Sequence, residues 1–572
     1  MNLQFRTGYD QHLNVYSSRL MVFFFIFVIL LSIFFSLMVL KTPAPMEFNA
    51  DSTQFSAERA MLHLEVIAKE PHPVGSEEHE NVRNYIFNEL NDLGLDPEIQ
   101  EAGEFKNIMA RINGTNSDSV IMLSAHYDTV SESPGAADDG MGVATILEVS
   151  RAIIEGDSIK HDLVLLFTDA EEKGDYGKGT LGAQAFVNEH PWSNEVEFVV
   201  NLEARGNSGP SIMFETSDQN GLLINEFKKA PYPVAYSFSY EVYKRMPNYT
   251  DFTVFIESGM QGLNFAPIIG LDAYHTLEDS VDNLNVGTMQ GQGDNALSLV
   301  QSLGNMELGN EKDDNAVYFT VFSKQFISYS SKLVIPFMIA IALLFIFIFI
   351  YGIRKQMLSF RGTVISMFVY IVLLGFVYAI FQLEWNAVYN LFSDFESTFI
   401  MDHRYSDMFL IGFALQISAL FILVYQLLNR KINQNNLSFG VLWIWFTFMI
   451  VCSLFLPGAS YLFTWPLLTS LLGMFYVFIR GENLRRDSYS NFVLLLLAIP
   501  GIFIFVPVIY LLSISLTLNI SGVISLVMAL VFSLFVPILP VLYRKRVILF
   551  PFVLFMLGFL FVMITSLVAG IV

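Results

Sequence analysis

Long and short apolar runs divide the chain into two kinds of region. Residues 20–40 are apolar without a charged residue, and eight further long apolar runs follow residue 332, whereas residues 41–330 contain only short ones. A helix of roughly 20 apolar residues spans the ~30 Å hydrocarbon core of a bilayer. The pattern therefore predicts nine transmembrane helices. The expected spans are 20–40, 333–352, 363–382, 408–428, 437–456, 461–479, 491–513, 519–542 and 547–570.

Basic residues predict how these spans cross the membrane. Of the 16 Lys and Arg residues outside residues 42–330, 13 fall in segments that a cytoplasmic amino terminus would place in the cytoplasm, as the positive-inside rule requires. No small-residue cleavage site directly follows residue 40, which favours a retained anchor over a signal peptide. The expected order is a cytoplasmic amino terminus (1–19), a transmembrane anchor (20–40), an extracytoplasmic domain (41–330) and an eight-helix membrane domain (331–572). The domain would face the periplasm, the cell exterior or an organelle lumen.

Details of the membrane region give three further expectations. Pro500 and Pro507 in one span, and Pro537 and Pro540 in another, predict kinks or breaks. The acidic, aromatic segment 383–407 is expected to be an external loop. The interiors of the eight carboxyl-terminal spans contain no Asp, Glu, Lys, Arg or His, which disfavours an ion-coupled transporter.

Within residues 41–330, apolar runs of strand length alternate with segments of helical periodicity. Strands are expected at 107–112, 120–128, 162–170, 197–204 and 211–216, and helices at 81–94, 140–154, 179–189, 219–229 and 282–304. Such alternation is typical of an α/β domain in which helices cover both faces of a mostly parallel mixed sheet.

The negative charge of this domain limits the kinds of molecule it can bind. Residues 42–330 hold 46 acidic and 16 basic residues, a net charge of −30, within a chain whose net charge is −22. This charge repels nucleic acid and favours cationic partners such as metal ions and peptide amino termini. Cys452 is the only cysteine, so the domain cannot contain a disulfide. A homodimer is compatible with the sequence.

Acidic and imidazole side chains follow several of the predicted strands. His126 and Asp128 end one strand, Glu171 and Glu172 end the next, and Glu203 ends a third, while Asp138 and His275 lie in loops. Because the carboxyl ends of parallel strands share one edge of a sheet, we expect these groups to converge. Histidine and carboxylate side chains are ligands of zinc, and two-metal hydrolases need a bridging carboxylate.

Five short motifs carry a resemblance to a known family. They are S-A-H-Y-D at 124–128, G-A-A-D-D-G at 135–140, D-A-E-E at 169–172, N-L-E-A at 201–204 and Y-H-T at 274–276. In this order they resemble the co-catalytic di-zinc peptidases, which include bacterial leucyl aminopeptidases, aminopeptidase Y, glutamate carboxypeptidase and glutaminyl cyclase. The overall layout is similar to that of the membrane-anchored branch, the endoplasmic-reticulum metallopeptidase and vacuolar membrane protease group.

The resemblance implies a role for each of these residues. Two Zn²⁺ ions per chain would be held by His126 and Glu203 on one side and by Glu172 and His275 on the other, with Asp138 bridging. Glu171 would be the general base, and Asp128 would orient His126. Many soluble members have Asp where this chain has Glu203, whose longer side chain shifts the geometry of its metal. The segment Tyr249–Phe252 resembles a T-D-F segment of the membrane-anchored relatives, and this resemblance would give it a part in shaping the substrate pocket.

Several functions stay open. The first hypothesis is a membrane-anchored exopeptidase that acts on short peptides. The acidic domain favours an aminopeptidase over a carboxypeptidase, which needs a cation to hold the terminal carboxylate. Arg205 is the main candidate for such a cation, and Lys244 and Arg245 are weaker ones. A non-catalytic binding domain of a receptor or transporter is the other alternative, while a one-zinc cyclase is disfavoured because both halves of the two-metal set are present.

Overall fold

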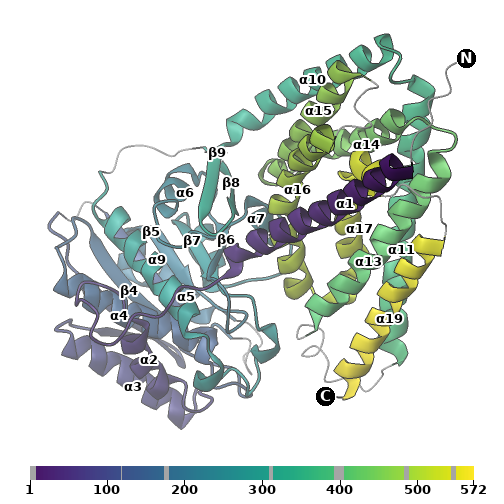
Figure 1. Ribbon diagram of the computed structural model, residues 1–572. Coiled ribbons are helices and arrows are strands. Elements are labelled where there is room, and N and C mark those ends of the chain that lie inside the picture. The colour runs from purple at the N-terminus through teal and green to yellow at the C-terminus, as the bar shows by residue number, and fades with distance from the viewer. Residues whose placement is uncertain are drawn as a thin grey trace, which may run out of the picture. The chain divides into compact units, whose positions relative to one another are not determined.

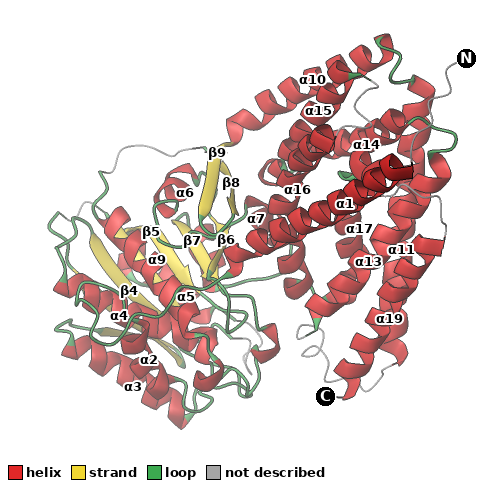
Figure 2. Cartoon of the chain, viewed as in Figure 1, coloured by secondary structure: helices red, strands yellow, loops and turns green. Residues whose placement is uncertain are grey.

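The chain forms two compact units. The computed structural model describes residues 8–116, 119–172, 179–307, 314–391, 405–481, 488–542 and 549–571. One unit comprises Val39–Lys332, here the α/β unit, and the other comprises Met1–Met38 with Leu333–Val572, here the membrane unit (Figure 1). The described strands all lie in the first unit, and the second is built from helices (Figure 2).

A seven-stranded mixed sheet forms the centre of the α/β unit. Its order is β1-β2-β4-β3-β5-β7-β6. Strands β4, β3, β5 and β7 run parallel, and β1, β2 and β6 run antiparallel to their neighbours. The strands are β1 (Glu98–Ala102), β2 (Phe105–Ile112), β3 (Val120–His126), β4 (Asp162–Thr168), β5 (Val196–Leu202), β6 (Ile212–Thr216) and β7 (Gln261–Ala266). The prediction of a mostly parallel mixed sheet is confirmed.

Helices cover both faces of this sheet because its central strands are apolar on both sides. In β3, Ile121 and Leu123 pack into one hydrophobic core, whereas Val120 and Met122 pack into a second. The larger core includes residues of α2, α4 and α9, and the smaller includes residues of α5 and α8. The helices are α2 (Ala57–Ile67), α3 (Glu77–Asp92), α4 (Met141–Glu155), α5 (Leu181–Glu189), α6 (Gly221–Phe227), α7 (Ser237–Tyr243), α8 (Asp251–Glu257) and α9 (Val286–Gly304).

Four strands of the unit were not predicted. They are β1, β7 and the hairpin of β8 (Ala316–Val321) and β9 (Gln325–Ser330). Strand β1 is largely exposed, and β7 has the mixed composition Q-G-L-N-F-A. Neither strand shows the apolar run that marks a central strand, although β7 is buried and pairs with β5 and β6.

The membrane unit is helical, as predicted. The α-helices among its described residues are α1 (Gly8–Leu37), α10 (Val334–Arg354), α11 (Phe360–Leu391), α13 (Ser406–Leu428), α14 (Gln434–Phe455), α15 (Tyr461–Arg480), α16 (Ser488–Ser515), α17 (Ser521–Ser533), α18 (Leu539–Leu542) and α19 (Leu549–Ile571). Within the described residues, eight helical segments are long and apolar enough to cross a membrane, and the apolar helix Leu518–Ser533 is shorter.

Prolines account for the difference from nine spans. The expected span 519–542 is divided into α17, a 3-10 turn at Val536–Ile538 and α18. Pro537 and Pro540 lack the backbone N–H that a continuing helix requires, so one long helix does not form. By contrast, α16 contains Pro500 and Pro507 and is continuous over 28 residues.

The expected external loop at 383–407 is wrong at its start. Helix α11 continues to Leu391, so Glu384 lies on a helix, where its Oε1 accepts a hydrogen bond from Gln416 Nε2 at 2.9 Å. The helical turns from residue 383 to 391 carry polar and aromatic side chains. Because these residues lower the hydropathy, the sequence pattern alone predicts a loop there. Residues 392–404 lie outside the described part of the chain.

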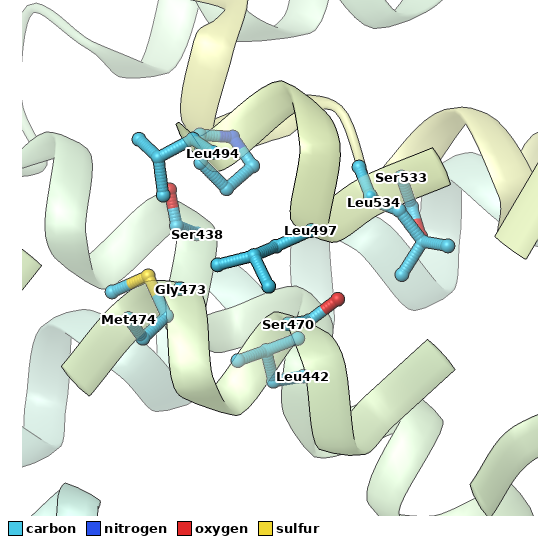
Figure 3. Close-up of a pocket in the computed structure, with 11 residues that line it drawn as sticks. Ser438, Leu442, Ser470, Gly473, Met474, Leu494, Leu497, Ser533 and Leu534 are labelled. Atoms are coloured by element: carbon cyan, nitrogen blue, oxygen red, sulfur yellow. The ribbon is translucent and has the colours of Figure 1, made fainter. Parts of the chain in front are cut away.

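A small cavity lies among the helices of the membrane unit. It holds about 20 Å³ and is lined by side chains that include Ser438, Ser470 and Ser533 (Figure 3). This volume suits a single water molecule, which needs roughly 10–15 Å³ of such space. The cavity is therefore too small for a peptide.

Candidate metal centre

His126 is the last residue of β3 and points one ring nitrogen into the site. Its side chain is 1% exposed. Nδ1 lies 3.0 Å from the backbone carbonyl oxygen of Asp128, and because a carbonyl can only accept, Nδ1 carries the proton. Nε2 is then the nitrogen that faces Asp138, at 3.3 Å from Oδ1. This arrangement leaves Nε2 as the potential metal ligand.

Asp138 lies between the two histidines. Its Oδ1 faces His126, and its Oδ2 is 3.2 Å from His275 Nε2. Asp138 belongs to the tight turn Ala136–Gly140, which precedes α4, and its peptide bond to Asp139 is cis. A carboxylate with one oxygen on each side has the form that a bridging ligand requires.

The turn after β4 positions two adjacent glutamates. The Asp128 carboxylate accepts hydrogen bonds from the backbone N–H groups of Glu171, at 3.0 Å, and Glu172, at 3.1 Å. Glu172 Oε1 lies 2.8 Å from His275 Nε2. The Asp128 carboxylate oxygen nearest to His126 is 3.7 Å from Nδ1. Asp128 thus contacts His126 through its carbonyl oxygen and uses its carboxylate to hold the glutamate turn.

Asp169 fixes the same turn from the other side. Its carboxylate accepts hydrogen bonds from the backbone N–H of Lys106, at 2.8 Å, and from the Tyr127 hydroxyl, at 3.1 Å. His79 Nε2 lies 3.0 Å from the other oxygen. The role of Asp169 is therefore to anchor the turn, and His79 belongs to this buried network.

Glu203 and His275 complete the site. Glu203 directly follows β5, and its Oε2 lies 3.9 Å from His126 Nε2. Asn201 donates a hydrogen bond to its other oxygen at 3.3 Å. His275 has a left-handed backbone, with φ of 59°, and its ring stacks on Tyr274 at a centroid distance of 3.8 Å.

These side chains form two triads that share one residue. In each triad, one ligand atom per residue lies within 4.8 Å of the others: His126, Asp138 and Glu203 in the first, and Asp138, Glu172 and His275 in the second. A third group of His126, Glu171 and Glu172 meets the same limit. The structure therefore brings together the five expected metal ligands and the expected general base.

Comparison with known proteins assigns the domain. Residues 107–300 match the model of peptidase family M28. The chain carries an M28 peptidase domain. Residues of the two triads span most of this match, from His126 to His275.

Fungal membrane peptidases are among the relatives. The chain is 30% identical over 323 residues to the vacuolar membrane protease of Candida tropicalis, a match that covers 52% of this chain and 35% of the relative. It is also 30% identical over 320 residues to the putative endoplasmic reticulum metallopeptidase 1 of Schizosaccharomyces pombe, covering 48% of this chain and 38% of the relative. The chain thus matches about a third of the length of these relatives.

Solved structures give a weaker likeness. The aminopeptidase from Aneurinibacillus sp. strain AM-1 is 13% identical with a TM-score of 0.37, and the match covers 44% of this chain and 95% of that chain. Porphyromonas gingivalis glutaminyl cyclase is 20% identical with a TM-score of 0.37, and the match covers 44% of this chain and all of the other. These values assign no activity to the M28 domain.

The site of the M28 domain concentrates negative charge. Burial raises the pKa values of Asp139, Glu171 and Glu203 well above their usual range. Burial lowers the pKa of His275, but its hydrogen bonds to Asp138 and Glu172 outweigh this effect and raise the pKa to about 10. Each carboxylate would therefore gain from a nearby cation, which is the electrostatic environment of a metal site.

The sequence did not indicate the role of two aspartates near the expected metal ligands of the M28 domain. Asp279 accepts hydrogen bonds from the backbone N–H groups of Ala137, at 2.7 Å, and Asp138, at 3.2 Å. Asp251 had been considered only as part of a pocket segment, yet burial raises its pKa to about 7. It accepts a hydrogen bond from Thr168 through Oδ2, and its Oδ1 is buried without a partner among the described residues. No spacing in the sequence links either aspartate to the strand-end ligands.

Proposed function

We propose that this chain is a membrane-anchored, zinc-dependent exopeptidase that releases amino-terminal residues from short peptides. The observation that carries the proposal is the pair of histidine–carboxylate triads sharing Asp138, inside a domain that matches peptidase family M28. A non-catalytic binding domain would not need a bridging carboxylate beside a further, half-buried glutamate, Glu171.

The donor set fits two zinc ions. Neutral imidazole nitrogen and carboxylate oxygen are ordinary zinc ligands, and the buried carboxylates outnumber the two histidines that could balance them. In the proposal His126 and Glu203 hold one ion, Glu172 and His275 hold the other, and Asp138 contacts both. When bound, the ions would polarise the scissile carbonyl and make the attacking water more acidic.

Glu171 is the proposed general base. Its backbone is fixed by Asp128, and its carboxylate belongs to a cluster with His126 and Glu172. In this role it takes a proton from the attacking water and returns it to the leaving amine. Asp128 is a positioning residue, because its carboxylate fixes the backbone of the general base and of the neighbouring ligand.

Adjacent glutamates offer a matched test of these roles. Glu171→Gln should keep about two zinc ions per chain and lower kcat by at least about 100-fold, the lower end of general-base contributions. Glu172→Gln should instead reduce zinc content, which elemental analysis of the purified chain measures. Near-normal turnover by Glu171→Gln would remove Glu171 from its role. A wild-type chain free of metal in chelator-free buffer would favour a binding domain over an enzyme.

Arg205 keeps a carboxypeptidase as the second candidate. This side chain is half-buried two residues after Glu203, and no ion pair to it is recorded among the described residues. The weaker candidates are engaged, since Lys244 pairs with Asp218 at 3.3 Å and Arg245 with Glu241 at 2.8 Å. The net charge of −30 over residues 42–330 favours the aminopeptidase, because it attracts a substrate ammonium and repels a carboxylate.

Blocked peptides distinguish the two directions. One short peptide is acetylated at its amino terminus, and its matched partner is amidated at its carboxyl terminus. An aminopeptidase cleaves only the amidated peptide. Cleavage of the acetylated peptide alone, together with its loss in Arg205→Gln, would assign the carboxypeptidase reaction instead.

A further inference from the structure

A second cavity lies within the α/β unit and has a cationic rim. It holds about 280 Å³, close to the lower end of small-molecule sites at roughly 300 Å³. Lys41 and Lys324 line it and are exposed, whereas Ser211, Val234 and Asn295 form a buried part of the wall. None of the catalytic side chains described above lines this cavity, and neither does any acidic residue.

One of the two lysines, Lys324, is held in place by an aromatic ring. Its ammonium Nζ lies 3.8 Å from the centre of the Tyr232 ring, a cation–π distance. Tyr232 is fixed in turn by Asn295, whose side chain accepts from its backbone N–H at 3.0 Å and donates to its backbone carbonyl at 2.9 Å. Asp294 acts electrostatically on Lys324 but does not line the cavity. The cation therefore sits on a preorganised wall.

The floor of the cavity offers an unused hydroxyl. Ser211 is 2% exposed, and its Oγ has no hydrogen-bond partner among the described residues. A buried hydroxyl without a partner costs free energy, which a ligand oxygen would recover. The lining thus combines two positive charges with one buried donor, in a domain region whose net charge is −30.

Both lysines lie close in the sequence to candidate membrane spans. Lys41 directly follows the candidate span Leu20–Leu40. Lys324 is separated from the next candidate span, Ser331–Arg354, only by the six residues of β9, which extend at most about 20 Å. A ligand presented at a bilayer surface is therefore within reach of the segments that carry these lysines.

We propose that this cavity binds a phosphate-bearing anion, with Lys41 and Lys324 as its charge partners and the Ser211 hydroxyl as a hydrogen-bond donor. A phospholipid headgroup and free phosphate share this chemistry, and the tether to the membrane favours the headgroup. The site is separate from the proposed peptidase function, so its test requires no peptidase activity.

Binding to the purified full chain in detergent provides the test. The probes are dihexanoyl phosphatidic acid, inorganic phosphate and dihexanoylglycerol, which lacks the phosphate. The variant K41Q/K324Q should bind phosphatidic acid at least about tenfold more weakly, since charge-assisted hydrogen bonds are lost. The matched control is K69Q/K228Q, which removes two exposed lysines of the same unit that lie outside the cavity.

Each outcome has a defined meaning. Binding of phosphatidic acid that K41Q/K324Q weakens and K69Q/K228Q preserves supports the headgroup site, and S211A should weaken it further. Equal binding of inorganic phosphate with the same dependence supports the anion site with free phosphate as its ligand. Equal weakening in both lysine pairs, or dihexanoylglycerol binding as tightly as phosphatidic acid, overturns the proposal. K41R/K324R keeps both charges and should keep binding, and the melting temperature of each variant separates lost binding from lost fold.

Discussion

Asp279→Asn tests how the bridging carboxylate is held in place. Asp279 is 1% exposed, and its two carboxylate oxygens accept separately from the backbone N–H groups of Ala137 and Asp138. An asparagine retains only one of these acceptors and turns an amide N–H toward the other donor. One of the two hydrogen bonds that hold the backbone of Ala137 and Asp138 is therefore lost.

The magnitude follows from these two contacts. A hydrogen bond to a charged group contributes about 1.5–3 kcal/mol, and a buried donor left without a partner costs about 1–3 kcal/mol. We expect the free energy of unfolding to fall by roughly 2 kcal/mol. The reaction rate should also fall, because a shift of about 1 Å in a reacting group can lower the rate about 100-fold.

The assay separates position from stability. Asp279→Asn and the control Asp282→Asn, an exposed aspartate in the following turn, are compared by urea unfolding, zinc content and peptide hydrolysis at a temperature where both are folded. The expected result is a kcat at least about tenfold lower in Asp279→Asn, with reduced zinc affinity and an unchanged control. If Asp279→Asn keeps wild-type kcat and zinc affinity, the carboxylate does not position Asp138.

Three further predictions concern other parts of the chain. Burial raises the pKa of Glu215 from 4.5 to about 7. Between these two pH values the folded state keeps a proton that the unfolded state has lost. The free energy of unfolding should therefore fall by at most about 3 kcal/mol from pH 5 to pH 8. Glu215→Gln should reduce that fall in urea unfolding, and an unchanged pH profile would contradict the assignment. In α9 a Cβ on Gly293 would lie 2.2 Å from the Phe55 ring, so Gly293→Ala should lower the free energy of unfolding by about 1–3 kcal/mol. Adding Phe55→Leu should restore part of this loss. A Gly293→Ala protein more stable than the wild type in urea unfolding would refute this packing. Because Cys452 is the only cysteine and is buried, Asp96→Cys adds a single exposed thiol. An impermeant maleimide should label this thiol when it is supplied on the extracytoplasmic side of the membrane, whether that side is the periplasm, the cell exterior or an organelle lumen. Labelling from the cytoplasmic side alone would reverse the expected orientation.

Much of the candidate site could be predicted because strand ends are visible in a sequence. The fully buried runs of β3 and β4 stop at His126 and just before Glu171, and parallel pairing aligns these ends. Order along the chain then places Glu203 beside them at the end of β5. Apolar runs that stop abruptly at ligand-type side chains thus predict both the strands and the site.

The supporting residues could not be predicted in this way. Asp279 lies in a polar loop with several other acidic residues, and only the fold shows that it faces the backbone of Asp138. Asp251 is the first residue of a short helix whose N-cap is Thr250, a position where the helix dipole favours an acidic side chain in any protein. Hydropathy alone counts the span 519–542 as one helix, because apolar composition is retained across Pro537 and Pro540. The two prolines predict a kink or break there, but the sequence does not show that the helix ends at Ser533.

Charge balance explains why a cation belongs at this site rather than elsewhere in an acidic domain. Asp138, Asp139, Glu203 and Asp251 are buried and Glu171 is half-buried around one pair of histidines. An ionised carboxylate that is buried costs several kcal/mol unless it is paired. Protonation would relieve the charge only by giving up the ligands and the base. The two divalent cations of the proposed function would offset four negative charges and leave the histidines neutral, as metal ligation requires. The raised pKa values and the shared Asp138 therefore have one physical cause, a set of carboxyl groups assembled at the ends of parallel strands for positive charge that the protein's own side chains do not supply.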